Sequence, residues 1–307
     1  MKNTEAEKNA PAKKNLVYVV IVTYNRLQYL KHVLESVRAQ TIIPDKIIVV
    51  NNGSSDGTIE WLTGAQDVTV INQSNSGGAG GFYTGVKYAY ENRADWVWVM
   101  DDDVMPKPDC LEVLLSYSNQ SKCLNPIHFD SQGEMLDEER WFDITSCNII
   151  NMFNQSYNNG KKIWYRNIGS FEGMLIAKEI IEKIGYPDKR FFITNDDLIY
   201  GYLANKHTNV AVISAAVMNK MEVNKTGKSV YSYHYYYHRN FWLLEEYVEK
   251  DLPGFDGYRK RRIIIKFLYT AYQIIRENEF KDRWKALKTL WKAYQDYKNK
   301  KEGQSFR

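Results

Sequence analysis

Four short apolar runs separated by helical patterns limit the folds open to this chain more than any other feature. The runs cover residues 16–22, 46–50, 68–71 and 96–100. Continuous apolar runs of this length are typical of strands in a parallel sheet, which are buried on both faces. Between the first two runs, apolar residues from Leu27 to Val37 recur with helical spacing. This alternation predicts a doubly wound α/β sheet with right-handed crossovers.

Polar segments follow three of these predicted strands. A doubly wound sheet binds its ligands beyond the carboxyl ends of its strands, where the strand order reverses. We therefore expect the three segments to converge on one crevice. They are Thr23-Tyr24-Asn25-Arg26, Asn51-Asn52-Gly53 and Asp101-Asp102-Asp103.

The three aspartates come directly after the last apolar run, so their carboxylates belong at the end of that strand. Adjacent carboxylates repel one another, and a bound cation offsets the repulsion. Oxygen ligands select a hard divalent cation such as Mg²⁺ or Mn²⁺. In an extended turn Asp101 and Asp103 point the same way and Asp102 points away. We assign Asp103 to the metal, Asp101 to the metal or a ribose, and Asp102 to a supporting role. A solvated acidic loop is the alternative.

A glycine-rich segment, Asn75-Ser76-Gly77-Gly78-Ala79-Gly80-Gly81-Phe82, comes just before a helical pattern. Glycines let a backbone approach a ligand closely and adopt positive φ. With the N-terminus of the next helix, Asn75, Gly77, Gly78 and Gly80 are candidates for binding a phosphate or a sugar hydroxyl. A dinucleotide-binding fingerprint is disfavoured, because its glycines follow the first strand and these follow the third. A flexible loop without a ligand stays open.

A second acidic motif, Asp196-Asp197, ends an apolar segment that begins at Phe191. Mutual repulsion raises the pKa of one carboxylate in such a pair, which suits a general base that takes a proton from a sugar hydroxyl. The pair also stands where it could cap a helix beginning at Leu198. The residues alone leave both interpretations open.

An aromatic segment over residues 231–240 places His234 and His238 four residues apart, on one face of a predicted helix. This spacing can bind a metal, but a zinc site needs further ligands that the segment lacks. Aromatic packing around Arg239 is favoured, with Arg239 as a candidate partner for a diphosphate or as a structural residue.

Charge is unevenly distributed along the 307 residues. The tail from Lys250 to Lys301 has 15 Lys and Arg against 6 Asp and Glu, although the net charge of the whole chain is only +4. Two helices are predicted from Ile263 onward, the second with an aromatic stripe beside lysines. Such a pattern, within residues 259–298, is typical of peripheral contact with an anionic membrane. Packing on the rest of the chain or on a partner subunit is the alternative.

Residues 1–15 are polar and Lys-rich, so we expect a disordered basic arm and not a signal peptide. The longest apolar run is too short to span a bilayer. Three cysteines without a CxxC pair fit a reducing compartment. We therefore expect a cytoplasmic protein, with contact to the inner face of the membrane left open and with no nucleic-acid partner.

Taken together, the motifs resemble the inverting glycosyltransferases of family 2, which have the GT-A fold. The matching stretches are residues 20–26, 48–58, 75–82, 101–103 and 191–197, and their order is more specific than any one of them. The resemblance implies a Rossmann-like α/β GT-A domain over residues 16–245 and a basic amphipathic helical region over residues 246–307. Within the family, the glycine-rich segment and Tyr236-Tyr237-His238-Arg239-Asn240 look most like galactofuranosyltransferases and rhamnosyltransferases of bacterial glycan assembly.

The resemblance implies roles for particular residues. The segment from Thr23 to Arg26 and Asn51 would border the nucleotide, and the three aspartates would bind Mn²⁺ or Mg²⁺ and the donor diphosphate. Asp197, beside Asp196, would be the base that deprotonates the acceptor hydroxyl. Galactofuranosyltransferases place a metal-binding His about where Asn219 stands, so the further metal ligand is Asn219, His234 or water. Ile199 stands where the family often has another acidic residue.

The function implied is the transfer, with inversion, of a hexose from a nucleotide-sugar to a glycan or polyprenyl-linked acceptor in cell-surface polysaccharide assembly. UDP-galactofuranose is the best guess for the donor and dTDP-rhamnose the runner-up. A catalytically inactive sugar-nucleotide-binding scaffold is a further alternative. A nucleotidyltransferase is disfavoured, because residues 23–26 have no glycine. A homo-oligomer is left open.

Overall fold

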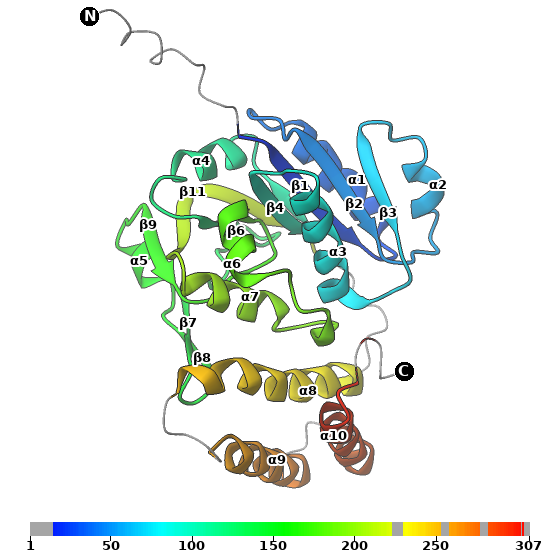
Figure 1. The fold of residues 1–307 in the computed structure, drawn as a ribbon, viewed down its shortest axis with the longest axis vertical. Helices are drawn as coiled ribbons and strands as arrows, with labels where there is room; N and C mark the ends of the chain where they lie inside the picture. The colour runs from blue at the N-terminus through cyan, green and yellow to red at the C-terminus, as the bar shows by residue number, and fades with distance from the viewer. Residues whose placement is uncertain (1–14, 223–229, 253–257, 277–281, 302, 304–307) are drawn as a thin grey trace, which may run out of the picture.

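A nine-stranded mixed sheet forms the centre of the computed structural model, which describes residues 15–222, 230–252, 258–276, 282–301 and 303 (Figure 1). The strand order is β3-β2-β1-β4-β10-β6-β11-β5, and β9 pairs with β11 off this path. The strands are β1 (Val17–Thr23), β2 (Lys46–Asn51), β3 (Val68–Asn72), β4 (Trp96–Asp101), β5 (Val104–Pro106), β6 (Cys123–Phe129), β9 (Ile163–Arg166), β10 (Met174–Ala177) and β11 (Val210–Lys220).

The first four strands confirm the predicted α/β fold. β1 pairs in parallel with both β2 and β4, and β2 pairs in parallel with β3. The second half of the sheet is mixed, because β10 runs antiparallel to β4 and β6, and β5 runs antiparallel to β11. The strand order reverses between β1 and β4, so ligands are expected beyond the carboxyl ends of these two strands.

Helices cover both faces of the sheet, which explains why its central strands are continuous apolar runs. Val19 and Ile21 of β1 belong to the core that packs against α1 (Leu27–Arg38). Val20 and Val22, pointing the other way, pack with Phe82 and its neighbours in α3 (Gly77–Glu91).

The glycine-rich segment is helical, which corrects the expectation of a loop in front of a helix. α3 begins at Gly77, so the glycines form its first turns. A Cβ on Gly81 or Gly85 would lie 2.4 Å or 2.2 Å from the methyls of Val22 or Val20. These two glycines therefore bring α3 close to β1, a packing role that the sequence pattern alone does not reveal.

The remaining helices of the first two thirds of the chain are short. They are α2 (Thr58–Leu62), α4 (Cys110–Ser116), α5 (Gln155–Asn158), α6 (Lys178–Ile184), the 3₁₀ helix η1 (Lys189–Phe191) and α7 (Asp196–Asn205). A separate hairpin of β7 (Arg140–Asp143) and β8 (Asn148–Asn151) extends from the sheet region toward the C-terminal helices (Figure 1).

A layer of helices lies below the sheet region in Figure 1. It contains α8 (Val230–Val248), the 3₁₀ helix η2 (Glu249–Asp251), α9 (Tyr258–Arg276) and α10 (Arg283–Lys298). The predicted boundary between residues 245 and 246 falls inside α8, and one apolar core joins α7, α8, α9 and α10. The helical region is thus continuous with the α/β part and does not begin at residue 246.

Two further expectations concern the chain termini and the membrane. The predicted basic arm lies outside the described residues apart from Asn15. Among the helices in the described ranges, none has the length and apolar character needed to cross a bilayer.

Candidate active site

Polar side chains from four neighbouring strands lie in one row at the carboxyl edge of the sheet. Thr23 at the end of β1 pairs with Asn51 of β2, and Asn51 pairs with Asn72 of β3. On the other side of β1, Val22 pairs with Asp101, the last residue of β4. The predicted convergence of the three strand-end segments is therefore what the structure shows.

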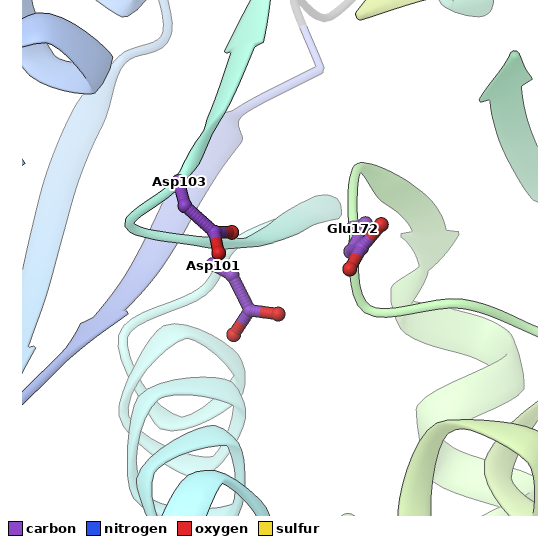
Figure 2. A group of neighbouring side chains, drawn as sticks. All are labelled: Asp101, Asp103 and Glu172. Carbon is purple, nitrogen blue, oxygen red and sulfur yellow. The ribbon is translucent and has the colours of Figure 1, made fainter. Parts of the chain in front are cut away.

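A group of three carboxylates stands at this edge. Asp101, Asp103 and Glu172 each offer an oxygen, and these oxygens lie within 4.8 Å of one another. In Figure 2, Asp101 extends from the end of β4 and Asp103 from the turn that follows, and Glu172 faces them from the segment that leads into β10. Asp101 and Asp103 share a side, as the alternation of an extended turn predicts.

Asp102 points away from this group and ties the end of β4 to the end of β1. Its carboxylate accepts hydrogen bonds from Thr23 Oγ1 at 2.7 Å and from Arg26 at 3.0 Å. Arg26 also donates to Asp103 Oδ2 at 2.9 Å. Burial raises the pKa of Asp102 to about 6, although Arg26 and Thr23 act in the opposite direction. These contacts support the predicted supporting role of Asp102, which stays a prediction.

The carboxylate group fits a divalent cation. Asp103 Oδ1 is buried and, within the described part of the chain, accepts no hydrogen bond. Burial and the charges of Asp103, Glu172 and Asp102 raise the pKa of Asp101 well above its usual range. Only Arg26 and Lys220 form ion pairs with these four carboxylates among the described residues, so negative charge is in excess when all four ionise. An all-oxygen ligand set of this kind suits Mn²⁺ or Mg²⁺.

Glu172 is a candidate ligand that sequence reasoning missed. The backbone around it is held from two sides: His128 Nε2 lies 2.6 Å from the Glu172 carbonyl oxygen, and Gly173 N–H donates to Val99 of β4 at 2.8 Å. The only sequence signal is one acidic residue before a glycine and the short apolar run at Met174. That signal is too common to identify a ligand without the fold.

The two predicted extra ligands lie on other elements than the carboxylate group, Asn219 in β11 and His234 in α8. Lys220 forms an ion pair with Glu172, and the alternation of side chains along a strand would point Asn219, the residue before it, to the opposite face of β11. His234 lies in α8, where its Nδ1 is 3.2 Å from His238 Nε2, and burial lowers its pKa to about 4. Glu172 is therefore a candidate for the third ligand position.

The segments that are expected to border the nucleotide, which follow β1 and β2, are joined by hydrogen bonds. The Asn25 side chain accepts from Ser55 N–H at 2.6 Å, which ties the loop after β1 to the loop after β2. Asn51 is fully buried and its amide donates to Asn72 at 2.9 Å, so it positions the loops from within. Tyr24 is 46% exposed and is the large apolar side chain that this edge presents to solvent.

Asn52 holds the start of α3 in place through hydrogen bonds. The sequence places Asn52 in a strand-end segment but gives it no role of its own. Asn52 donates to the Gly77 carbonyl at 2.7 Å and accepts from Ser76 N–H at 3.1 Å. Asn75 accepts from Gly77 N–H at 2.9 Å.

The three candidate glycines differ in what surrounds them. A Cβ on Gly77, whose φ is +75°, would lie 1.9 Å from the Phe192 carbonyl oxygen, so only glycine fits there. A Cβ on Gly80 would lie 2.2 Å from Ser76 Oγ, whereas one on Gly78 would meet nothing within 4 Å. Gly78 is therefore the candidate with space for a ligand at the helix N-terminus.

The acidic pair lies in the first turn of α7. Burial and the charge of Asp197 raise the pKa of Asp196 to about 7. Burial also raises the pKa of Asp197. The hydrogen bond that Asp197 accepts from Leu198 N–H at 2.7 Å and the positive charge of Arg140 both act to lower that pKa. A Cβ on Gly169 would lie 3.2 Å from the Asp197 carbonyl oxygen, and Glu172 follows Gly169 closely in the chain, so the pair lies near the carboxylate group. The helix begins at Asp196 and its N-cap is Asn195, so the pair does not cap a helix that begins at Leu198. The role of Asp197 as a base stays a prediction.

The backbone before this pair is held in an unusual conformation. Phe192, Thr194 and Asn195 have backbone φ values of 63°, 67° and 66°, which residues other than glycine rarely adopt. Each such residue costs about 1–3 kcal/mol and persists only where the surroundings impose it. Ala79 N–H, in the first turn of α3, donates to the Phe192 carbonyl at 3.2 Å. This strained segment therefore links the glycine-rich turn to the acidic pair.

Arg239 and Asn240 of α8 impose that conformation. Asn240 donates to the carbonyls of Phe191, Ile193 and Thr194 at 2.9, 2.6 and 2.9 Å. Arg239 donates to the Phe191 carbonyl at 2.8 Å and to the carbonyl before it at 2.7 Å. Both side chains are fully buried. Of the two roles left open for Arg239, these contacts favour the structural one, because backbone carbonyls occupy its guanidinium.

Replacing Asn240 with Ala tests this role. Each buried carbonyl left without a donor costs about 1–3 kcal/mol, so we expect a lower urea midpoint of unfolding. Asp197 follows the released segment, and a misplacement of about 1 Å lowers kcat about 10²-fold. The KM of the donor should change little, because the carboxylate group lies on other segments. Steady-state kinetics and urea unfolding measure these effects, with Asn92→Ala, at an exposed helix end, as the control. Loss of donor affinity with unchanged stability would instead place Asn240 at the donor.

Comparison with known proteins places this geometry in a family. The sequence model described as glycosyl transferase family 2 matches residues 18–185. Galactofuranosyltransferase GlfT1 of Mycobacterium tuberculosis is 28% identical over 203 residues, which cover 59% of this chain and 62% of that protein. O-antigen chain rhamnosyltransferase RfbN of Salmonella typhimurium is 21% identical over 260 residues, covering 82% of this chain and 81% of RfbN. The match to GlfT1 therefore spans less than two thirds of that relative's length.

A solved structure supports the same fold. The crystal structure of GalNAc-T7 with UDP, GalNAc and Mn²⁺ superposes with a TM-score of 0.60 at 12% sequence identity. The match covers 91% of this chain and 55% of that one. Together with the family match and the observed sheet, it confirms the GT-A fold followed by C-terminal helices.

Proposed function

We propose that this chain, which belongs to glycosyl transferase family 2 and is a glycosyltransferase, transfers a hexose with inversion and depends on a divalent metal. The observation that carries this proposal is the group of Asp101, Asp103 and Glu172 at the carboxyl end of β4, with the acidic pair of α7 nearby. Metal ligands for a diphosphate and a carboxylate base are the two parts that such a transfer requires.

The donor is proposed to lie over the carboxyl ends of β1, β2 and β4. Tyr24 is exposed and offers a ring on which a nucleotide base can stack. Asp101, Asp103 and Glu172 would hold Mn²⁺ or Mg²⁺, which supplies positive charge to offset the charge that develops on the leaving diphosphate. Gly78 has open space at the N-terminus of α3, where backbone N–H groups favour a phosphate or a sugar hydroxyl.

Asp197 is proposed as the general base. Its raised pKa favours taking a proton from the acceptor hydroxyl, and Arg140 counters part of that effect. As the proton passes to Asp197, the acceptor oxygen forms a bond to the anomeric carbon. The bond from that carbon to the diphosphate oxygen breaks on the opposite face, and the configuration inverts.

The donor sugar is proposed to be galactofuranose from UDP-galactofuranose, with rhamnose from dTDP-rhamnose as the second candidate. The relatives named galactofuranosyltransferase and rhamnosyltransferase support this choice, and the UDP and Mn²⁺ in the GalNAc-T7 structure support a metal-bound nucleotide. The proposed acceptor is a glycan or a polyprenyl-linked glycan in bacterial cell-surface polysaccharide assembly. The cytoplasmic setting and an oligomeric state stay predictions.

A donor panel tests the proposal. The full chain is incubated with Mn²⁺ and UDP-galactofuranose, dTDP-rhamnose or UDP-glucose, and the release of nucleotide is measured with and without a glycan acceptor. We expect turnover with UDP-galactofuranose at least tenfold above that with UDP-glucose, since each mispaired sugar hydroxyl costs about 1–3 kcal/mol. Metal-dependent binding without turnover of any donor would favour the inactive scaffold.

A further inference from the structure

One face of α9 is apolar and exposed. Its side chains project over an arc of about 140° at 100° per residue, which makes a continuous stripe along the helix. The exposed fractions are 52% for Ile264, 65% for Ile265, 60% for Leu268, 54% for Tyr269, 54% for Tyr272 and 57% for Ile275. We call these six residues the α9 face.

The opposite side of α9 packs against α8 and α10, and this packing holds the helix on the rest of the chain. Ile263 and Ile274 are buried in the core shared with α8 and α10. Phe267 packs against Trp242 of α8 and Tyr294 of α10, with ring centroids 6.4 and 5.5 Å apart. The helix therefore satisfies its inner side within the chain and leaves a second apolar side uncovered. Exposed apolar patches of this extent mark a contact with another body.

Positive charge surrounds the α9 face. The 19 residues of α9 include six Lys and Arg and no Asp or Glu. Arg261 and Arg276, near the two ends of the stripe, are exposed. On α10, Lys285 and Lys288 are exposed as well. This combination of an apolar stripe and basic flanks matches the surface of an anionic lipid bilayer.

Aromatic side chains of α10 border the same region. Trp284 and Trp291 are 76% and 53% exposed and lie seven residues apart, on one side of α10. Trp291 packs edge-on against Phe267 of α9, with ring centroids 6.0 Å apart. Tryptophan is enriched where an apolar surface meets lipid headgroups.

We propose that the α9 face lies in the plane of an anionic bilayer, with its apolar side chains among the acyl chains and its basic residues at the headgroups. A second copy of this chain is a poorer occupant, because it would bring an equally basic surface against this one. The sequence predicts the membrane contact within residues 259–298, a range that covers nearly all of α9 and α10. In the structure, the central residues of α10, such as Leu290 and Ala293, are buried, so α9 supplies most of the contact.

The inference deepens the proposed function and rests on it for the acceptor, since a polyprenyl-linked acceptor is found at a bilayer. α8 lies between α9 and the α/β part in Figure 1, and Asn240 of α8 contacts the segment before the acidic pair. A bilayer under α9 would therefore lie on the side of the molecule that carries α8, the helix that contacts the segment before Asp197.

Co-sedimentation with vesicles tests the inference on the full chain. Vesicles of phosphatidylcholine with about one third phosphatidylglycerol are compared with vesicles of phosphatidylcholine alone. We expect Ile265→Glu and Leu268→Glu each to lower the partition coefficient on anionic vesicles at least about tenfold, because a carboxylate replaces an apolar side chain at the acyl boundary. The control is Ile43→Glu, since Ile43 has the same 65% exposure as Ile265 but precedes β2 at the sheet.

The outcomes separate this inference from the proposed function. Equal binding of wild type and both α9 variants, or equal binding to the two kinds of vesicle, would overturn the bilayer contact. A wild-type dimer in sedimentation velocity that Ile265→Glu converts to a monomer, with lipid binding unchanged, would overturn it in favour of a second copy. Donor turnover is measured in the same samples without lipid. If the wild-type chain binds anionic vesicles but turns over no donor, the result would count against the proposed function and support the membrane contact.

Discussion

Replacing Asp197 with Asn is expected to lower kcat about 10²- to 10⁴-fold, the range over which a positioned general base acts. Asparagine keeps the size of the side chain and its acceptor for Leu198 N–H, which lies 2.7 Å from the carboxylate. It cannot take a proton from the acceptor hydroxyl. The first turn of α7 should therefore stay in place while the chemical step fails.

Donor affinity separates a base from a metal ligand. Asp101, Asp103 and Glu172 lie on segments other than α7, so UDP with Mn²⁺ should bind the Asp197→Asn variant as it binds wild type in calorimetry. The control is Asp109→Asn, the same chemical change at the exposed start of α4. A variant that loses UDP binding would move Asp197 into the donor site, and one that keeps kcat would remove it from the mechanism.

The pH dependence of kcat should report the same carboxylate. Burial raises the pKa of Asp197, and the base acts only when it is ionised. As the pH falls, kcat should therefore begin to decline at a pH above about 3.9, the ordinary pKa of an aspartate. The residual activity of Asp197→Asn should lack this acid limb.

Removing the metal is the second change with a large expected effect. Chelation by EDTA should lower kcat/KM about 10³-fold, because charge stabilisation by a divalent cation contributes several kcal/mol to such transition states. Added Mn²⁺ should restore the activity. Asp103→Asn should weaken binding of Mn²⁺ in the presence of UDP at least about tenfold, since one anionic ligand is lost.

The same calorimetric titration tests which residue is the third ligand. Glu172→Gln should weaken Mn²⁺ binding as Asp103→Asn does, because the two carboxylates belong to one group. Asn219→Ala and His234→Ala should leave it unchanged if Glu172 is the third ligand, since Asn219 lies in β11 and His234 lies beside His238 in α8. Unaltered Mn²⁺ binding by Asp103→Asn and Glu172→Gln, or EDTA-resistant turnover, would contradict the metal site.

Much of the α/β part could be predicted from the sequence, because its signals are local. A strand covered on both faces needs an unbroken apolar run, and β1, β2, β3 and β4 all lie where such runs occur. Asp101 and Asp103 follow β4 directly, so their position at the carboxyl edge depends only on the end of that strand. The alternation of side chains then separates Asp102 from them.

Other features depend on contacts between distant segments. Glu172 becomes a ligand candidate because the chain returns as β10 beside β4, and no short-range pattern encodes that pairing. Arg239 lies in a motif that the sequence associates with the donor, yet burial against carbonyls 48 and 49 residues away gives it a structural role. A buried guanidinium must satisfy its donors, and only the packing shows which acceptors are available.

The aspartate cluster and the acidic pair were thus determined by the sequence itself, as was the basic, amphipathic character of the C-terminal helices. The tertiary structure decided that Glu172 joins Asp101 and Asp103 in one carboxylate group. It also decided that α9 and not α10 exposes the larger apolar face. The physical reason is the same in both cases. Residue type and periodicity determine what a segment can contact, whereas the partner that covers it depends on how the whole chain folds.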